Sequence, residues 1–354
     1  MAGGIGSRFW PVSRTEFPKQ FIDFFGTGKT LIQSTYDRFL KICPPENIFI
    51  VTNEMYTSII KEQLPDIQDN QILAEPIMRN TAPCVAYGSM KIAQINPDAT
   101  IVVAPSDHTI ANQDKFIAAI EQSLLAAANN DCLITLGIQP SRPDTGYGYI
   151  QYTDTVLPSD TDLRKVKLFT EKPNIDLAKS FLQSGDFLWN AGIFIWSAQA
   201  INNAFEKHLP EMHEIFLSGK AAYNTPHEAA FISNAYQQCI NISIDFAIME
   251  KANNVYVLPA EFGWSDLGTW ASIYEMAEKD YVGNVVIPSE RVMMFNSSNC
   301  MVNVPEGKLV ILQGLHDYIV VESNNILMIC PRSEEQSVKQ IVADIKSKHG
   351  NKFI

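Results

Sequence analysis

The first twenty residues, MAGGIGSRFWPVSRTEFPKQ, combine glycines with basic side chains in a pattern suited to phosphate binding. Gly3, Gly4 and Gly6 carry no Cβ atom, so the main-chain N–H groups can approach a phosphate chain closely. Arg8 offers a planar fork of donors for phosphate oxygens, and Lys19 supplies a mobile point charge. Two cations and a row of amides would stabilise a leaving group whose negative charge rises as a bond breaks. Glycines also serve plain turns, so the pattern alone indicates phosphate chemistry only weakly.

A second glycine-rich stretch, DFFGTGKT, ends like a nucleotide-binding P-loop but lacks the first glycine of that motif. Asp23 stands at that position and would place a carboxylate against the phosphate oxygens. We interpret residues 26–28 as a turn and Thr30 as the N-cap of a helix over LIQSTYDRFL. Nucleotide binding is therefore not expected at this stretch.

Short β-branched runs alternate with helical patterns in the part of the chain that follows these loops. Strands are predicted at 47–52, 71–76, 100–108 and 132–137, and helices at 55–63, 81–95 and 114–128. Strand, helix and strand in this order favour right-handed crossovers and a parallel sheet. Asp107 ends one of these strands and is expected at the carboxyl edge of the sheet, where open α/β folds bind ligands.

The rest of the chain changes character twice. From 149 to 257, strands near YIQY, KVKLFTE and WNAGIFIW are interrupted by helices such as 175–183 and 198–207, which indicates an elaboration of the same sheet. After Tyr281, short apolar alternations are punctuated by Gly, Pro or Asn every eight to ten residues. This pattern predicts a small all-β module. A final helix carries one apolar stripe and is expected to dock on the protein.

The predicted fold is α/β with two domains. A chain of 354 residues, of which 46% are hydrophobic, can bury a large core. Residues 1–281 are predicted to form a Rossmann-like catalytic domain whose mixed, mainly parallel sheet is flanked by helices. Residues 282–354 are predicted to form a β-helix-like module followed by the terminal helix.

Composition excludes several classes of partner. The formal net charge of -12 disfavours nucleic acid and anionic membranes, because both need a broad basic face. There is no run of about eighteen apolar residues and no secretory signal pattern, so a cytoplasmic location is expected and a membrane partner is not. The six cysteines lie far apart without a Cys-x-x-Cys pair, which argues against a metal cluster or a disulfide framework.

Seven sequence blocks, taken in order, resemble the sugar-phosphate nucleotidyltransferases. The first block is Gly-Gly-x-Gly-Ser-Arg-x-x-Pro with the later Pro-Lys pair, at residues 3–11 and 18–19. The block AEPIMRNTAP at 74–83 narrows the resemblance to the mannose-1-phosphate guanylyltransferases, also called GDP-mannose pyrophosphorylases. PSDH, GYGYI, FTEKP, WNAGIF and FGWSDLGTW follow at the rough spacing of that family. The resemblance covers essentially the whole chain.

The resemblance implies Mg²⁺-dependent nucleotidyl transfer between GTP and mannose 1-phosphate. It assigns Asp107 and Asp266 to Mg²⁺, which prefers hard oxygens and usually takes one or two protein carboxylates. A phosphate oxygen of mannose 1-phosphate would attack the α-phosphorus of GTP in line, giving GDP-mannose and pyrophosphate. The attacking phosphate is already an anion, so no general base or protein nucleophile is needed. Holding two polyanions together is the main obstacle, and Arg8, Lys19 and Lys172 are the expected catalytic cations.

The resemblance also implies where the nucleotide and the sugar phosphate bind. The expected nucleotide-binding residues are Gly3, Gly4, Gly6, Ser7, Glu75, Asn80 and Thr81. The expected sugar-phosphate-binding residues are Gly148, Glu171, Lys172 and Asn190. Asn80 or Thr81 can also cap the following helix, and Lys172, which precedes a proline, is expected to be extended. The group that reads the base is left open, and His108 is expected to be structural.

Two other functions stay open. The chain could act on another hexose 1-phosphate or nucleotide, as a glucose-1-phosphate thymidylyl- or uridylyltransferase does, or it could be a catalytically silent regulator that binds sugar nucleotides. The acidic and basic residues that the family needs are all present, which favours an enzyme. Members of the family are often dimers, and the β module offers a surface for a homodimer.

Both ends of the sequence carry a further expectation. The family places a buried β-strand directly before the glycine loop, whereas this sequence begins almost at the loop. We interpret Met1 as an internal methionine of a longer protein. Some bacterial relatives carry a C-terminal phosphomannose isomerase domain, for which the sequence is too short, so no isomerase activity is expected.

Overall fold

The computed structural model describes residues 1–288 and 290–354, and its contacts divide the chain into two compact units. Unit 1 consists of Met1–Gly3, Arg38–Pro105 and Ile110–Trp264, and unit 2 of Gly4–Asp37, Ser106–Thr109 and Ser265–Ile354. Each unit therefore gathers segments that are distant in sequence. Unit 2 combines most of the glycine loop, the short segment around Asp107 and the C-terminal module. The domain boundary expected after residue 281 stays a prediction.

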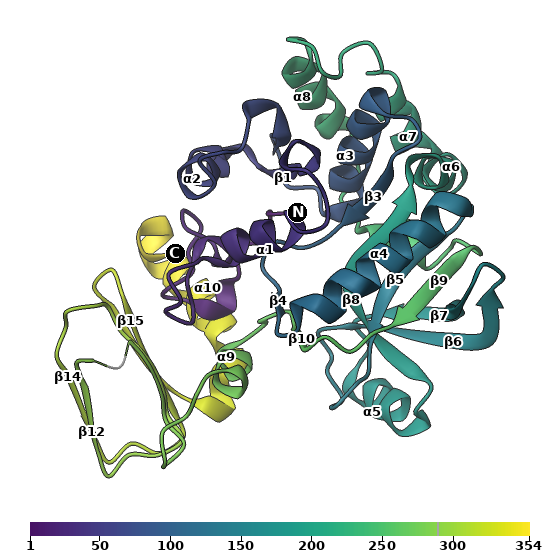
Figure 1. Cartoon of the computed structure of the whole chain (residues 1–354). Coiled ribbons are helices and arrows are strands. Elements are labelled where there is room, and N and C mark those ends of the chain that lie inside the picture. The colour runs from purple at the N-terminus through teal and green to yellow at the C-terminus, as the bar shows by residue number, and fades with distance from the viewer. Residues whose placement is uncertain (289) are drawn as a thin grey trace. The chain divides into compact units, whose positions relative to one another are not determined.

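Unit 1 is an α/β structure built around a six-stranded sheet (Figure 1). The strands of this sheet are β3 Thr100–Val103, β5 Leu133–Ile138, β6 Gly148–Leu157, β7 Asp160–Glu171, β8 Phe187–Ser197 and β9 Val255–Pro259. β1 Ile50–Asn53 and β2 Ile72–Glu75 form a separate two-stranded parallel sheet in the same unit. Its helices are α2 Thr57–Gln63, α3 Thr81–Ile95, α4 Gln113–Asn129, α5 Ile175–Ser184, α6 Ala198–His208, α7 Pro210–Leu217 and α8 Glu228–Gln238. The chain passes between the units after Gly3, within α1 Leu31–Phe39, after Pro105, within β4 Thr109–Ile110 and within β10 Trp264–Ser265.

The six-stranded sheet is mixed and has the strand order β3-β8-β5-β9-β7-β6. β5 and β9 pair in parallel, while β8 runs antiparallel to both β3 and β5. β7 runs antiparallel to both β9 and β6. β3, β5, β6 and β9 therefore point the same way, against β7 and β8, and the predicted mixed sheet is confirmed. Of the neighbouring strands in this sheet, β5 and β9 pair in parallel and the others pair antiparallel. The position of β8 between β3 and β5 is not evident from the sequence.

Alternate side chains of the central strands enter two separate cores, one on each face of the sheet. Leu133 and Trp196 face the core formed with α3, α6, α7 and α8. Their sequence neighbours Ile134 and Ile195 face the core under α4, which lies across β5 and β8 in Figure 1. A strand covered on both faces needs apolar residues at consecutive positions. This is why β5 and β8 appear in the sequence as nearly continuous apolar runs.

The chain start lies along β1 in unit 1. Ala2 forms a parallel bridge with Thr52, whose Oγ1 donates to the carbonyl oxygen of Ala2 at 2.9 Å. The N-terminal ammonium of Met1 donates to the carbonyl oxygen of Ala104 at 2.8 Å. These bonds fix the residues that lead into the glycine loop.

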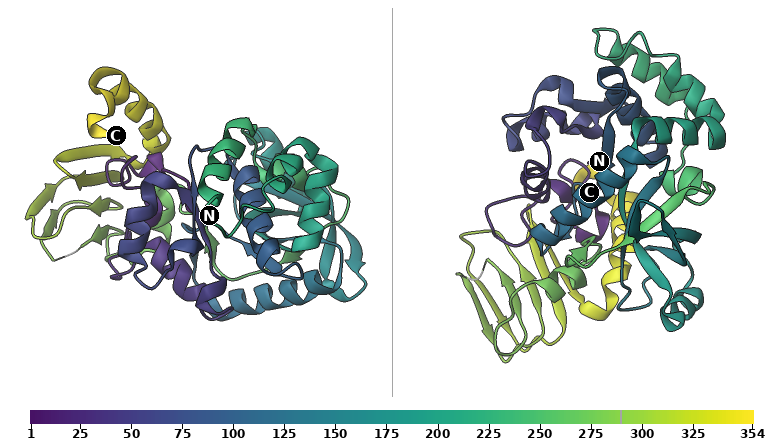
Figure 2. Two further views of the ribbon diagram at one scale, coloured as in Figure 1. Left: turned by 90° about the horizontal axis from the view of Figure 1, so that it is seen from above. Right: turned by 45° about the vertical axis from the view of Figure 1, so that its right-hand side comes forward.

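Unit 2 contains a β-helix and the terminal helix (Figure 2). Its elements are β11 Val285–Ile287, β12 Val292–Phe295, β13 Met301–Asn303, β14 Val310–Gln313, β15 Tyr318–Ser323, β16 Ile326–Pro331, α9 Trp270–Met276 and α10 Val338–His349. β11, β13 and β15 stack in parallel, with Val285 opposite Met301 and Met301 opposite Ile319, and β12 stacks in parallel on β14. Successive turns of one chain stacked in this way form a β-helix, so the predicted module is confirmed.

The terminal helix α10 docks within unit 2. Val338 is buried, and Ile341, Val342 and Ile345 pack against the same apolar core. These four residues form the stripe seen in the sequence, so the predicted docking role is confirmed. Across the residues that the structure describes, no helix combines the length and the apolar character needed to cross a bilayer.

The GTGKT stretch is a turn held by a carboxylate. Asp23 accepts hydrogen bonds from the N–H groups of Phe25 at 3.1 Å and Gly28 at 2.6 Å. Gly28 has a φ of 79°, a conformation that favours glycine. The Thr30 N–H donates to Gln33 Oε1 at 2.9 Å, and the Gln33 N–H donates to Thr30 Oγ1 at 3.5 Å, which caps α1. The predicted turn and N-cap are both confirmed.

Candidate active site

Gly6 needs to be a glycine for two reasons. Its φ is 69°, in the left-handed region. A Cβ atom at this position would lie only 2.5 Å from the Cβ atom of Lys19. The Lys19 N–H donates to the carbonyl oxygen of Ile5 at 3.3 Å, so the glycine loop and the Pro-Lys segment pack directly on each other. The two parts of the first sequence block thus form one local structure in unit 2.

The same loop carries N–H groups that are available to a ligand. The main-chain N–H groups of Gly4, Gly6 and Ser7 donate to no acceptor within the described part of the chain. Arg8 Nε is buried and likewise has no hydrogen-bond partner among residues 1–288 and 290–354. Several unsatisfied donors on one short loop suit an anion that has several acceptor oxygens, as phosphate does.

Lys19 contacts residues from the other two sequence segments of unit 2. Its Nζ lies 2.9 Å from Asp107 Oδ2 and donates to the main-chain oxygens of Asp266 at 2.7 Å and Leu267 at 3.1 Å. The Lys19 side chain is only 7% exposed, and that of Asp107 is 25% exposed. The structure therefore brings together Lys19, Asp107 and Asp266, which the sequence separates widely.

Asp107 is held in its ionised form by its neighbours. Burial pushes the pKa of Asp107 upward, but the positive charges of Lys19 and His108 outweigh burial and leave this pKa below its ordinary value. His108 Nε2 lies 3.9 Å from Asp107 Oδ1. An ionised carboxylate beside an ammonium group provides both signs of charge that a metal–phosphate site requires.

Asp107 and Asp266 supply donor chemistry that fits Mg²⁺. Both side chains carry hard carboxylate oxygens, and Mg²⁺ usually takes only one or two of these from a protein and keeps its other positions for phosphates and water. The Asp266 carboxylate lies against Gly268, where a Cβ atom would approach Asp266 Oδ2 to 2.9 Å. Gly268 thus leaves room for the carboxylate that precedes it in the block FGWSDLGTW.

Glu75 is a buried carboxylate at the end of β2 in unit 1. Tyr236 Oη donates to Glu75 Oε1 at 2.8 Å. Burial raises the pKa of Glu75 to about 7, although the hydrogen bond from Tyr236 and the N-terminal ammonium act in the opposite direction. A Cβ atom on Gly3 would lie 3.9 Å from Glu75 Oε2. Gly3 and Glu75, which belong to two different sequence blocks, are therefore neighbours.

The start of α3 shows different roles for Asn80 and Thr81. Asn80 is the N-cap, with a φ of 67°, and its side chain accepts from the Thr81 N–H at 2.9 Å. Thr81 Oγ1 instead accepts from the N–H of Ile244 at 2.9 Å. The predicted cap is confirmed for Asn80, whereas Thr81 fastens a distant segment of unit 1 to α3.

Gly148, Glu171 and Asn190 meet in the six-stranded sheet. Gly148 on β6 pairs with Glu171 on β7. A Cβ atom on Gly148 would lie 2.5 Å from Glu171 Oε2 and 3.2 Å from Asn190 Cβ, so glycine is needed for this close approach. Lys172 forms an ion pair with Glu171, and its side chain is 63% exposed. The four residues expected to bind the sugar phosphate thus form one cluster.

The expectation that Lys172 is extended is wrong. Its φ is 49°, in the left-handed region, and its N–H donates to the carbonyl oxygen of Tyr147 at 3.2 Å. Pro173 keeps the preceding residue out of the right-handed helical region, and the bond to Tyr147 selects the left-handed alternative over the extended one. Non-glycine residues in this region are strained, and they are concentrated at functional sites.

Asp245 belongs to the same cluster, although the sequence motifs did not identify it. Asn190 Nδ2 donates to Asp245 Oδ1 at 2.9 Å. Burial and, secondly, the negative charge of Glu171 raise the pKa of Asp245 to about 6. In the sequence this residue lies within the apolar run SIDFAIM. A single acidic residue inside such a run is the signal that could have found it, because a buried charge needs a reason.

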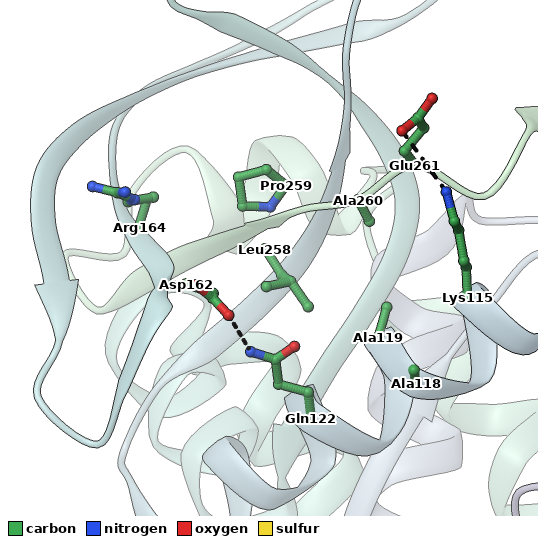
Figure 3. A pocket seen from close by; sticks show the side chains of 10 residues that line it. All are labelled: Lys115, Ala118, Ala119, Gln122, Asp162, Arg164, Leu258, Pro259, Ala260 and Glu261. Atoms are coloured by element: carbon green, nitrogen blue, oxygen red, sulfur yellow. Dashed lines mark hydrogen bonds and ion pairs between the residues drawn. The ribbon is translucent and has the colours of Figure 1, made fainter.

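A hollow of about 450 Å³ lies elsewhere in unit 1, between α4 and the strands β7 and β9 (Figure 3). Lys115 Nζ lies 3.9 Å from Glu261 Oε2, and Gln122 Nε2 donates to Asp162 Oδ2 at 3.2 Å. Arg164 is also part of the lining. The residues that line this hollow include none of the predicted site residues, so it is not the candidate active site.

Comparison with known families identifies the fold as that of a nucleotidyltransferase. Residues 1–282 match the family described as nucleotidyl transferase, and residues 290–345 match the MannoseP isomerase/GMP-like beta-helix domain. The chain therefore belongs to the nucleotidyl transferase family of enzymes.

Within that class, the chain belongs to the mannose-1-phosphate guanylyltransferases. It is 34% identical over 360 residues to the mannose-1-phosphate guanylyltransferase of Salmonella montevideo, with 100% of this chain and 74% of the relative covered. It is 36% identical over 352 residues to the alginate biosynthesis protein AlgA of Pseudomonas syringae pv. tomato, covering 98% of this chain and 71% of the relative. A crystal structure from Thermus thermophilus, described as a mannose-1-phosphate geranyltransferase, matches with a TM-score of 0.86 and 28% identity over 98% of both chains. The family resemblance inferred from the motifs is confirmed.

Proposed function

We propose that this protein transfers the guanylyl group of GTP to α-D-mannose 1-phosphate, giving GDP-mannose and pyrophosphate. Membership of the guanylyltransferase family supports this choice of substrates. The observation that carries the chemistry is the Lys19 ammonium, which binds the Asp107 carboxylate and the main-chain oxygen of Asp266. The Lys19 cation and the Asp107 carboxylate, two groups that phosphoryl chemistry needs, are thereby in direct contact beside the main chain of Asp266.

The reaction needs one bond to form and one to break. A phosphate oxygen of mannose 1-phosphate forms a bond to the α-phosphorus of GTP, and the bond from that phosphorus to the β-bridging oxygen breaks. The electron pair of the broken bond leaves with pyrophosphate. The attacking oxygen is already anionic near neutral pH, because the second pKa of a phosphate ester is about 6. No protein nucleophile or general base is required.

Positive charge and N–H donors from unit 2 act on the triphosphate. The free N–H groups of Gly4, Gly6 and Ser7 and the buried Nε of Arg8 bind phosphate oxygens, and Lys19 adds a buried cation. Such fixed donors stabilise the charge that develops on the departing pyrophosphate without having to reorganise. Asp107 and Asp266 would hold Mg²⁺, which when bound neutralises phosphate charge and orients the triphosphate.

The nucleotide block in unit 1 binds the guanosine part of GTP. Glu75 and Gly3 are neighbours, and the absence of a side chain on Gly3 leaves space beside Glu75 Oε2. A carboxylate accepts two hydrogen bonds at once, and guanine offers adjacent N–H donors that adenine does not. We therefore assign Glu75 to the base, with Asn80 and Thr81 shaping the start of α3.

The cluster of Gly148, Glu171, Lys172 and Asn190 binds mannose 1-phosphate. Glu171 accepts from sugar hydroxyls, and Lys172 pairs with the sugar phosphate. The largely exposed Lys172 side chain can move from Glu171 to a ligand, because water around the ammonium group screens its charge. Asn190 contributes a side-chain amide to the same sugar.

A cytoplasmic homodimer completes the proposal. All six cysteines are free thiols, as is usual in a reducing compartment. The β-helix in unit 2 carries exposed apolar side chains, among them Met293, Phe295 and Ile311, which offer a surface for a second copy of the chain.

The proposal is tested by pyrophosphate release from purified protein. GTP is paired with mannose 1-phosphate and then with glucose 1-phosphate, and mannose 1-phosphate is paired with ATP, UTP and dTTP, each with and without Mg²⁺. We expect kcat/KM to be highest for GTP with mannose 1-phosphate, by about a hundredfold, since unpaired polar groups in a pocket penalise the wrong ligand strongly.

Two outcomes would contradict the proposal. Faster release with glucose 1-phosphate and UTP or dTTP would make the protein a relative with another substrate. Binding of GTP and mannose 1-phosphate without pyrophosphate release would make it a regulator that binds sugar nucleotides.

A further inference from the structure

Asp245 is held in place by the start of α3. It is the first residue of a π-helical turn, η6, which spans Asp245–Met249. The residue before it, Ile244, donates its N–H to Thr81 Oγ1 at 2.9 Å, and the Ala82 N–H donates to the carbonyl oxygen of Ile242 at 3.1 Å. The position of the Asp245 carboxylate is therefore determined by packing on α3 rather than by a mobile loop.

Asn190 presents its side chain in one fixed orientation. Its Oδ1 accepts from Thr135 Oγ1 at 2.9 Å and from the Gly192 N–H at 3.0 Å, and its Nδ2 donates to Asp245 Oδ1 at 2.9 Å. An amide oxygen has two lone pairs and an amide nitrogen has two hydrogens. Both lone pairs are used, so Asn190 can offer a ligand one N–H and no acceptor.

The groups around Asp245 set its charge. Asp245 is faced by the carboxylate of Glu171, the ammonium of Lys172 and the amide of Asn190. Burial and the Glu171 charge raise the pKa of Asp245 to about 6, against the smaller opposing effects of Lys172 and Asn190. The ionised carboxylate is a pure acceptor, whereas the protonated form keeps one acceptor oxygen but also presents an O–H that donates. Ionisation of Asp245 therefore favours the hydrogen bond from the Asn190 N–H.

We propose that Asp245 is a positioning residue for the sugar phosphate, which orients Asn190 so that its second N–H binds a hydroxyl group of the hexose ring. The inference rests on the proposed function, because it deepens the role of the Gly148, Glu171 and Asn190 cluster. A hydroxyl group accepts from Asn190 while it donates to the neighbouring Glu171 carboxylate. The Asn190 donor and the Glu171 acceptor thus satisfy the acceptor and the donor of one ring hydroxyl group.

The first experiment separates binding from turnover. Mannose 1-phosphate is titrated calorimetrically into the full chain with Mg²⁺ and a non-hydrolysable GTP analogue, and KM values are measured for both substrates. For D245A we expect the Kd and KM of mannose 1-phosphate to rise about tenfold to a hundredfold, because the Asn190 amide loses the acceptor that holds its N–H donors in place. D245N keeps an acceptor for Asn190 and should show a smaller rise. The KM of GTP should change less than twofold in both variants.

Matched controls exclude a general loss of structure. D154N makes the same chemical change at an exposed position on β6 and should leave all constants unchanged. T135V removes the bond that fixes Asn190 Oδ1 and should weaken mannose 1-phosphate binding in the same direction as D245A. Thermal unfolding of each variant shows whether it is folded at the assay temperature.

The pH profile supplies a signature that a purely structural role would not give. With GTP saturating, kcat/KM for mannose 1-phosphate in the wild type should fall below pH about 6 more steeply than in D245N. The phosphate of the substrate titrates in the same range, but it does so equally in both proteins.

The possible results are distinguishable. Unchanged binding of mannose 1-phosphate in D245A, or equal losses for mannose 1-phosphate and GTP, would overturn the role of Asp245. If D245A binds mannose 1-phosphate more weakly than wild type, but wild type releases no pyrophosphate, the proposed function is overturned and this inference stands. Wild-type protein that binds no mannose 1-phosphate would overturn both.

Discussion

Two glycine-rich stretches lie close together in the sequence, and they have opposite surroundings. In the stretch that ends in GTGKT, the carboxylate of Asp23 already accepts from the N–H groups of Phe25 and Gly28. In the earlier stretch, the N–H groups of Gly4 and Gly6 have no acceptor within the described part of the chain. The first arrangement completes a turn, whereas the second leaves donors for a ligand.

The lysines of the two stretches differ in the same way. Lys29 pairs with Asp37 at 2.5 Å on the surface, with side chains 60% and 44% exposed. Lys19 pairs with Asp107 at 2.9 Å and is only 7% exposed. We therefore expect phosphate binding at the first stretch, where the amides stay free and the lysine is buried, and not at the second.

The largest effect is expected from replacing the two lysines. K19M should lower kcat/KM by about a hundredfold to a thousandfold, the size expected for losing one fixed charge at a phosphate site. K29M should stay within about twofold, because an exposed ion pair contributes little. Steady-state pyrophosphate release measures both, with circular dichroism to confirm folding. Equal losses of kcat/KM in K19M and K29M would show that the two lysines do not differ in their role.

The next effect is expected from Gly6 and Gly28, which have positive φ and belong one to each stretch. G6A combines a φ of 69° with a Cβ contact of 2.5 Å to Lys19, and it should lower kcat about tenfold to a hundredfold. G28A has a φ of 79° but nothing within 4 Å of the new Cβ atom. It should cost about 1 kcal/mol of stability with normal activity. A G6A variant with wild-type kcat would contradict the packing of the loop on Lys19.

Glu75 lies beside Gly3, the first glycine of the earlier stretch, and its carboxyl group is buried. Native Glu75 keeps its proton up to a pKa of about 7, whereas the unfolded chain releases it near the ordinary value of 4.5. Between these values the native state binds more protons, so this group lowers the unfolding free energy as pH rises. Relative to E75Q, wild type should lose about 2 kcal/mol between about pH 5 and pH 8.

Urea unfolding of wild type and E75Q at the two pH values measures this difference. E75Q keeps an acceptor for Tyr236, so it serves as a matched uncharged control. A pH dependence identical in the two proteins would mean that Glu75 titrates normally. A rise in the KM of GTP for E75Q would in addition support its assignment to the base.

The smallest effect is expected at Asp23. D23A removes the acceptor for two main-chain N–H groups and should lower the unfolding free energy by about 1–2 kcal/mol. Activity should stay within about twofold, because this turn is expected to take no part in substrate binding. A large rise in the KM of GTP for D23A would show that the stretch binds nucleotide after all.

Local pattern and spacing predict much of this fold. The helix expected at 81–95 is α3 Thr81–Ile95, and Thr30 caps α1 as its side-chain chemistry indicates. The apolar stripe of α10 docks as predicted. The place of β8 between β3 and β5 could not be predicted, because strand order depends on contacts between distant residues. No separate helix was predicted for α7 or α8.

The candidate site likewise has features that the sequence predicted and features that it did not. The motifs named Lys19, Asp107 and Asp266, which the structure brings together. The left-handed conformation of Lys172 depends on a hydrogen bond to Tyr147, which no rule about the residue before a proline contains. Likewise, the pKa values of Glu75 and Asp245 are raised by burial, which depends on contacts between residues that are distant in the sequence.

We propose that Asp107 and Asp266 hold the metal that works with Lys19 on the triphosphate. The most direct test is Mn²⁺ binding, followed by electron paramagnetic resonance with GTP present, for wild type, D107N and D266N. We predict that each substitution weakens Mn²⁺ binding at least about tenfold and lowers Mg²⁺-dependent pyrophosphate release in parallel. Wild-type Mn²⁺ affinity together with wild-type turnover in both variants would contradict the account.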